Sequence, residues 1–259
     1  MIRHDLQCIF VEIPRTASTS IRSIIGKPVK AHRNIVEIKY DLETLWTHYG
    51  GPANRLLGCL YPWIPTSERA RIGRQKFFHF YKFSFVRNPW DRVVSMYKLN
   101  MKRHEDLAKS GKGSNTKTKK DQFGLEMFIS FEEFVSWIQY SSATSNHAAP
   151  HRYQLDWLTD SSGNLLMNFI GSFESLESDW NVVADVLRID KRLPHLNHIS
   201  SKHYTEYYSE KTRAIVAEKF RIDVETFGYE FDSGPQLLAG INKKLMQQSD
   251  WLTGSTIQK

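Results

Sequence analysis

The chain has 259 residues, of which 41% are hydrophobic and 13% aromatic, and this composition suits one globular α/β domain with a sizeable core. Its formal net charge of +7 favours anionic partners, such as a nucleotide, a polyanionic glycan, nucleic acid or an acidic membrane surface, without choosing among them. Two cysteines, Cys8 and Cys59, are too few for a disulfide framework or a cysteine-rich zinc site.

The first predicted unit is a strand, a loop and a helix, over residues 8–25. Residues 8–13 are mostly apolar and β-branched or aromatic, as in a buried strand, and Pro14 ends the strand because it has no N–H to donate. Isoleucines at helical spacing follow the loop and predict a helix. The loop between them is a run of basic, small and hydroxylated residues: Arg15, Thr16, Ala17, Ser18, Thr19 and Ser20.

Such a loop turns several backbone N–H groups toward one point, where the N-terminus of the helix adds a partial positive charge. Arg15 adds a full charge and a planar fork of donors. The loop is therefore a candidate cradle for a tetrahedral oxyanion, either phosphate or sulfate. The alternative is that its hydroxyls only cap the helix.

The next two segments carry weaker signals. Within residues 30–39, Ile35, Val36 and Ile38 predict a short helix or strand. It is preceded by His32, which is either a surface residue or a catalytic group. Residues 47–76 are rich in Gly, Pro and Trp, so we expect an irregular segment that lines a cleft or packs on the surface.

A second strand, turn and helix is predicted over residues 80–97. Arg87 stands in the turn, and Pro89 suits the first turn of the helix. Turns at the carboxyl ends of neighbouring parallel strands line one crevice, so Arg87 and Ser95 can both reach one phosphate. Asp91 and Arg92 are interpreted as a local cap and a salt-bridge partner. The G-x-x-x-x-G-K-[ST] pattern of P-loop nucleotidases is absent, and no acidic residue suggests Mg²⁺.

Together the two motifs resemble the cofactor motifs of sulfotransferases that use 3′-phosphoadenosine 5′-phosphosulfate (PAPS). They read Val11-Glu-Ile-Pro-Arg-Thr-Ala-Ser-Thr-Ser20 and Phe83-Ser-Phe-Val-Arg-Asn-Pro-Trp-Asp-Arg-Val-Val-Ser-Met-Tyr97. The likeness is to the carbohydrate-type enzymes, including the heparan 2-O-sulfotransferases, and to the bacterial family-2 sulfotransferases. Residues 168–180, 193–197 and 227–231 resemble later landmarks of the family, so that the resemblance covers about residues 7–232.

The resemblance implies a single α/β domain over residues 1–235, with a central parallel sheet flanked by helices in a P-loop-like sulfotransferase fold. Residues 236–259 would form a polar tail or a docking helix. The resemblance also implies roles for individual residues and requires no metal. The 5′-phosphosulfate would be held by the loop residues Arg15, Thr16, Ala17, Ser18, Thr19 and Ser20. Arg87 and Ser95 would bind the 3′-phosphate, and Ser201 and Lys202 would help to hold the nucleotide. His32 would act as the base.

One departure from the family pattern concerns the first loop, where Arg15 stands in place of the usual lysine. An arginine fork can neutralise charge on a bridging oxygen, but it cannot donate its proton outright. We therefore expect an active enzyme with an altered rate, and a binding-only relative is the alternative.

The remaining chain is predicted to build structure. Residues 98–124 are polar and basic, and they predict a solvated loop or an electropositive flap. Helices are expected at 131–140, 176–187, 209–220 and 223–227, and a strand at 165–170. Gln154 is a candidate contact for acceptor or cofactor, and the last twenty residues are expected to fray or to dock as a helix.

The predicted function is transfer of a sulfuryl group from PAPS to a hydroxyl acceptor, with a carbohydrate favoured. The rivals are a nucleotide-dependent phosphotransferase, a non-catalytic polyanion- or nucleotide-binding protein, and a nucleic-acid-binding protein, although no nucleic-acid recognition module is found. If His32 is not the base, Glu12 and His79 are the next candidates. Without an apolar run of membrane-spanning length or a secretory signal, the expectation is a soluble, cytoplasmic protein with no stable membrane insertion.

Overall fold

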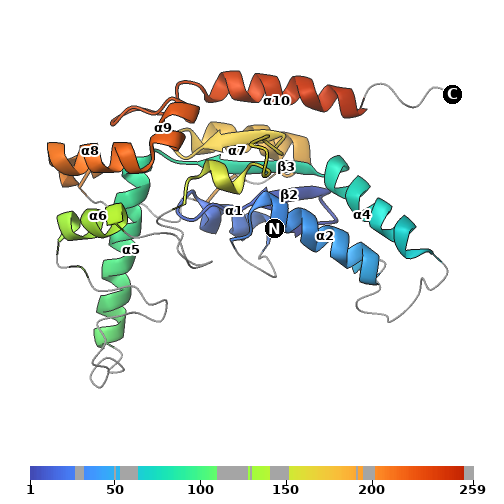
Figure 1. Ribbon diagram of the computed structural model, residues 1–259, viewed down its shortest axis with the longest axis horizontal. Helices are drawn as coiled ribbons and strands as arrows, with labels where there is room; N and C mark the ends of the chain where they lie inside the picture. Colours follow the sequence, from blue (N-terminus) through green and yellow to red (C-terminus); the bar gives the residue numbers. More distant parts are fainter. Residues whose placement is uncertain are drawn as a thin grey trace.

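The computed structural model describes residues 1–26, 32–49, 51–52, 64–109, 128, 130–140, 152–190, 192–194 and 202–253. Its centre is a four-stranded sheet with the strand order β1-β2-β3-β4 (Figure 1). The short β1 (Ile2–Arg3) pairs antiparallel with β2 (Cys8–Val11), while β2, β3 (Tyr81–Val86) and β4 (Phe169–Ser172) are parallel. The predicted α/β fold with a central, mainly parallel sheet is confirmed.

The sheet is buried on both faces, because side chains alternate along each strand. In β2, Cys8 and Phe10 pack on one face, and Ile9 and Val11 pack on the other. The first face is covered by α1 (Ser18–Ile25) and α7 (Leu176–Leu187). The other face contributes to the larger core, with α2 (Ile35–Tyr49), α5 (Pro89–Lys109), α6 (Phe131–Tyr140), α8 (Glu210–Lys219) and α9 (Arg221–Phe227).

Helix α4 (Thr66–His79) corrects the prediction of an irregular segment over residues 47–76. It packs beside α2 (Figure 1), and α2 itself is a full helix rather than a short helix or strand. The two helices approach closely at Gly73, where a Cβ atom would lie only 3.0 Å from the Cα atom of Glu43. The feature that indicates helix α4 is therefore its packing against α2, a helix that lies elsewhere in the sequence.

Helix α5 continues through the first part of the segment predicted as a polar loop, so that this prediction is wrong for residues 98–109. Residues 110–124 lie outside the described part of the chain. The N-terminal part of α5 is packed by α6 and α8, and its C-terminal part projects away from the sheet (Figure 1). None of the described helices is long and apolar enough to cross a membrane.

Strand β4 lies later in the chain than predicted, because Leu165 instead forms an isolated bridge with Thr159. β4 is the last strand of the sheet, and α10 (Leu238–Thr253) lies along it (Figure 1). The side chain of Asn242 accepts a hydrogen bond from the N–H of Ile170 at 2.9 Å and donates one to its carbonyl at 2.8 Å. This helix therefore covers the edge of the sheet that would otherwise be open.

Candidate active site

The loop after β2, residues 12–17, will be called the Arg15 loop. Arg15 (φ 72°) and Ala17 (φ 68°) are in the left-handed region, and Thr16 between them is not. A backbone that alternates in this way turns successive N–H groups to one side and forms an anion-binding concavity. Helix α1 begins directly after Ala17, its N-cap residue.

The hydroxyls of this loop do not cap helix α1, which corrects the alternative interpretation of the sequence. Thr16 Oγ1 and Ser18 Oγ both donate to the carbonyl of Ile13, at 2.9 and 3.1 Å, and the N-terminus of α1 has no side-chain cap. The first N–H groups of a helix have no partner within the helix. They are therefore the groups that this loop offers to an anion, together with the helix dipole.

The turn after β3, residues 87–88, lies against the Arg15 loop. Arg87 Nη1 donates to the backbone carbonyl of Arg15 at 3.1 Å, and Arg15 Nε donates to Ser95 Oγ of helix α5 at 2.9 Å. The structure thus brings together Arg15, Arg87 and Ser95, as the parallel arrangement of β2 and β3 predicts.

Arg87 is held in one orientation by three contacts. Besides its bond to the Arg15 carbonyl, its Nε donates to the carboxylate of Asp91 at 2.8 Å. Its guanidinium carbon lies 3.9 Å from the centre of the Phe173 ring. A guanidinium has five N–H donors, and these contacts use two of them, so that the Nη atoms keep donors for a ligand.

Two side chains that were not predicted as structural supports hold the backbone of the turn. Gln154, predicted as a ligand contact, is instead fully buried: its Oε1 accepts from the N–H of Arg87 at 2.9 Å, and its Nε2 donates to the Arg87 carbonyl at 2.8 Å. Glu174 accepts from the N–H of Asn88 at 2.6 Å. Arg92, interpreted with Asp91 as a local cap and salt-bridge partner, is buried, and its side chain donates to the backbone carbonyls of Pro14 and Arg152.

Gln154 is held in turn by Asp223, whose carboxylate accepts from the N–H groups of Gln154 and Leu155 at 2.8 and 3.0 Å. Burial raises the pKa of Asp223 to about 6, although the nearby Arg92 guanidinium and the two N–H donors oppose this shift. The sequence holds no local signal for this support, because it joins segments about 70 residues apart.

Positive charge is concentrated around the Arg15 loop. Burial, together with the charges of Arg87 and Arg103, lowers the pKa of Arg15 to about 10, while the Asp91 carboxylate opposes the shift. Lys98 lies near the same charges. Burial and the Arg87 charge lower the pKa of Lys98, and the Asp91 charge raises it. An anion at this point would relieve the repulsion. Lys98 and Arg103 belong to the basic segment for which an electropositive flap was the alternative prediction, and neither was predicted as a nucleotide contact.

His32 lies at the same end of β2 as the Arg15 loop. Its side chain is exposed, and its Nδ1 is 3.3 Å from the backbone carbonyl of Glu12, directly after the strand. Glu12 is itself buried, its carboxylate oxygens form no hydrogen bond, and the carboxylate lies 3.6 Å from Arg22 Nη1. Burial raises the pKa of Glu12.

His79, the other predicted alternative for the base, is at the wrong end of the sheet. It is the last residue of α4 and stands just before β3 begins, whereas Arg87 follows the end of β3. Its Nδ1 is 2.7 Å from the carbonyl of Gln75. This alternative is therefore wrong.

Of the late loop, Ser201 lies outside the described residues, and Lys202 is described. The Nζ atoms of Lys202 and Lys98 lie 5.5 and 5.0 Å from the centre of the same ring, that of Tyr207 in the 3-10 helix η2 (Tyr204–Tyr207). Lys98 is three residues after Ser95, hence on the same face of α5. This contact brings Lys202 toward the side of α5 that carries Ser95.

The fold and this site together define an α/β protein with a candidate oxyanion-binding loop between β2 and α1. Residues 1–230 match the sulfotransferase family, and the chain belongs to this family of PAPS-dependent transferases. A protein of Archaeoglobus fulgidus, named only as an uncharacterized protein, is 30% identical over 122 residues, which are 46% of this chain and 75% of that protein. No solved structure matches the chain. Among the described residues, no group of three His, Cys, Asp or Glu side chains could hold a metal ion.

Proposed function

We propose that this protein transfers a sulfuryl group from PAPS to a hydroxyl of a carbohydrate acceptor. One observation carries the proposal: Arg87 donates to the carbonyl of Arg15, and Arg15 donates to Ser95, so that two distant motifs form one cationic site. Such a site suits a nucleotide with two separate anionic groups.

The donor groups fit the two ends of this nucleotide. The uncapped N-terminus of α1 suits the 5′-phosphosulfate. The residues at this end are Thr16, Ala17, Ser18, Thr19 and Ser20. Arg87 retains free Nη donors for the 3′-phosphate. Ser95 accepts from Arg15, so that its own hydroxyl proton remains for the same phosphate. Lys202 would add a positive charge near this end, and Ser201 is proposed from sequence alone.

When bound, PAPS supplies an activated sulfuryl group with the nucleotide 5′-phosphate as leaving group. The guanidinium of Arg15 and the N–H groups of its loop would stabilise the negative charge that develops there. Removing one such donor typically costs about 3–4 kcal/mol of transition-state stabilisation. His32, in its neutral form near pH 7, would take the proton of the acceptor hydroxyl.

A carbohydrate acceptor is supported by the resemblance to carbohydrate-type sulfotransferases and by the charge around the site. On α5, the charge of Arg103 lowers the pKa of Arg15, and Lys98 is close enough to Arg87 for that charge to lower the Lys98 pKa. An already sulfated or carboxylated glycan would be attracted to this side of the molecule.

The test begins with calorimetric titration of 3′,5′-phosphoadenosine, followed by labelled-sulfate transfer from PAPS to a panel of sugar, phenol and steroid acceptors. Arg87→Ala should weaken nucleotide binding, whereas His32→Ala should keep binding and abolish transfer. Arg71→Ala and His79→Ala, the second at the opposite end of the sheet, serve as matched controls.

Each alternative function predicts a different result. Nucleotide binding without transfer to any acceptor would indicate a binding-only relative, and ATP hydrolysis would indicate a phosphotransferase. Full turnover of His32→Ala would place the base elsewhere, with Glu12 the remaining candidate. Nucleotide binding by Arg87→Ala as tight as that of the control Arg71→Ala would refute the site.

A further inference from the structure

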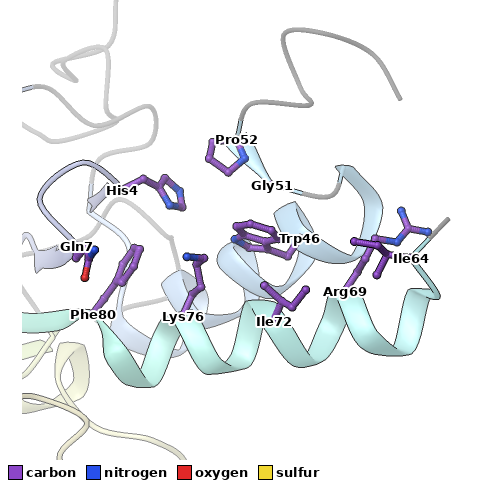
Figure 2. Close-up of a pocket in the computed structure, with 10 residues that line it drawn as sticks. All are labelled: His4, Gln7, Trp46, Gly51, Pro52, Ile64, Arg69, Ile72, Lys76 and Phe80. Atoms are coloured by element: carbon purple, nitrogen blue, oxygen red, sulfur yellow. The ribbon is translucent and has the colours of Figure 1, made fainter. Parts of the chain in front are cut away.

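A cavity of about 320 Å³ lies far from the site described above (Figure 2). Its walls include Gln7 and Phe80, which directly precede β2 and β3. Arg15 and Arg87 follow the same two strands, so that the cavity and the nucleotide site are at opposite ends of the sheet. Helices α2 and α4 form the rest of the wall, together with His4, Gly51, Pro52 and Ile64.

The cavity is basic. Arg69 and Lys76 line it, and none of its ten lining residues is acidic. The Nζ atom of Lys76 lies 5.3 Å from the centre of the Trp46 ring and 5.9 Å from that of Phe80. Among the described residues, no carboxylate is within salt-bridge distance of Lys76. Burial and the Lys76 charge both lower the pKa of His4, while the Asp5 carboxylate, which does not line the cavity, opposes the shift.

Two donors in the same wall also have no acceptor. The Trp46 Nε1 and Arg69 Nε atoms are buried and form no hydrogen bond. Buried donors in native proteins are nearly always bonded, so that such a pair points to a missing acceptor. Trp46 is fixed from its other edge by Gly51 (φ +109°), where a Cβ atom would lie 2.8 Å from the indole ring.

The wall also has an apolar part, which Trp46, Ile64 and Ile72 provide (Figure 2). A ring-shaped molecule would pack against this part, since aromatic side chains accept the faces of both planar and sugar rings. Sites for small molecules commonly combine such a surface with a few charged groups, in cavities of about this size.

We propose that this cavity binds a small organic anion that contains a ring, with its anionic group beside Lys76 and Arg69 and its ring against Trp46. Sugar acids, sugar sulfates and aryl sulfates share this chemistry. This second site is distinct from the site of transfer, so that it does not depend on the proposed reaction.

The experiment is calorimetric titration of the full chain with two anionic probes, glucuronate and phenyl sulfate, each beside a neutral partner, methyl glucoside and phenol. We expect at least one anionic probe to bind and its neutral partner not to bind. Comparison of the two anions distinguishes a sugar ligand from an aryl ligand. Because the cavity and the nucleotide site are at opposite ends of the sheet, a bound probe should leave the affinity for 3′,5′-phosphoadenosine unchanged.

Lys76→Gln and Arg69→Gln should each weaken binding of the anionic probe by about tenfold, since each removes a charge-assisted contact. Lys39→Gln is the matched control for Lys76, because the Lys39 Nζ lies 5.8 Å from the Phe77 and Phe78 ring centres but outside the cavity. Arg71→Gln is the control for Arg69. Two variants keep the test informative if one of them fails to fold.

Two results would overturn the proposal. The first is that neither anion binds the native chain at about 10 mM, a concentration that would reveal even weak millimolar affinity. The second is that Lys76→Gln and Arg69→Gln, with folding checked by circular dichroism, bind the probe as tightly as Lys39→Gln and Arg71→Gln.

Discussion

The Nε atom of Arg15 donates a hydrogen bond to the hydroxyl of Ser95 at 2.9 Å, and this contact joins two segments 80 residues apart. Arg15 follows β2, whereas Ser95 lies on the second turn of α5, after β3. The two motifs are therefore connected in the protein itself. An anion that reaches either of them meets a side chain whose position is set by the other.

Replacing Ser95 by alanine should weaken the binding of 3′,5′-phosphoadenosine. The change removes the acceptor that holds Arg15 and the hydroxyl proposed for the 3′-phosphate. Hydrogen bonds to charged groups contribute about 1.5–3 kcal/mol, so that a rise in Kd of at least about tenfold is expected by calorimetry. Ser178→Ala, an exposed serine of α7 whose hydroxyl bonds within its own helix, is the control. An unchanged Kd for Ser95→Ala would contradict the assigned role.

Gln154→Met should loosen the turn that carries Arg87. Methionine fills a similar space, but it leaves the buried N–H and carbonyl of Arg87 without the two bonds that Gln154 provides. Each unpaired buried group costs about 1–3 kcal/mol, so with two such groups the free energy of unfolding should fall by about 2–6 kcal/mol in urea titrations.

The nucleotide affinity should fall together with this stability, because Arg87 loses its fixed backbone. Gln139→Met on the exposed face of α6 should change neither quantity. If Gln154→Met kept the free energy of unfolding and the nucleotide affinity of the native chain, the turn would not depend on this side chain.

The two motifs of the site were predictable from the sequence because each is continuous. A buried strand, a polar turn and a helix stand next to one another, and parallel strands place both turns at one edge of the sheet. The supports of the turn were not predictable. Gln154 and Glu174 reach residues 87 and 88 from more than 60 positions away, and an isolated polar residue carries no mark of such a contact.

The helices that were missed have a common physical reason. Only Gly73 and Phe77 are buried in α4, so that its charged sequence lacks the apolar stripe on which the prediction of a helix depends. The end of α5 is polar because it projects from the body of the protein (Figure 1). Composition alone does not separate a solvated helix from a solvated loop.

Gly171→Ala should destabilise the protein through crowding between β4 and its neighbours. A Cβ atom at this position would lie 2.5 Å from Cε1 of Phe85 and 3.1 Å from Cβ of Asp179. Phe85 is fully buried. Overpacking of this kind costs about 1–3 kcal/mol, to be measured as a loss in the free energy of unfolding.

Gly240→Ala is the matched control for this change, because a Cβ atom there would meet nothing within 4 Å. Gly240 is in helix α10, where alanine should stabilise the helix by up to about 1 kcal/mol. If both variants shift stability in the same direction, the contact with Phe85 is not what excludes a side chain at residue 171.

Lys82 should give the stability of the protein a dependence on alkaline pH. Its ammonium group is buried beneath the end of α4 and donates to the carbonyls of Phe77, Phe78 and Phe80 at 3.1, 3.1 and 2.8 Å. Burial lowers its pKa from 10.5 to about 8. Between these two values the unfolded chain holds the proton that the folded chain has lost, so stability should rise with pH across this window.

The measurement is the free energy of unfolding of the native chain minus that of Lys82→Met, at pH values from about 7 to about 10.5. This difference should be constant below about pH 8 and should then rise by up to about 3 kcal/mol, because each pKa unit corresponds to 1.36 kcal/mol. Taking the difference removes the titration of other groups. Lys102→Met, at an exposed position of α5, should give a difference that does not vary with pH. A constant difference for Lys82→Met as well would mean that the buried ammonium keeps its ordinary pKa, with its three carbonyl partners offsetting the whole effect of burial.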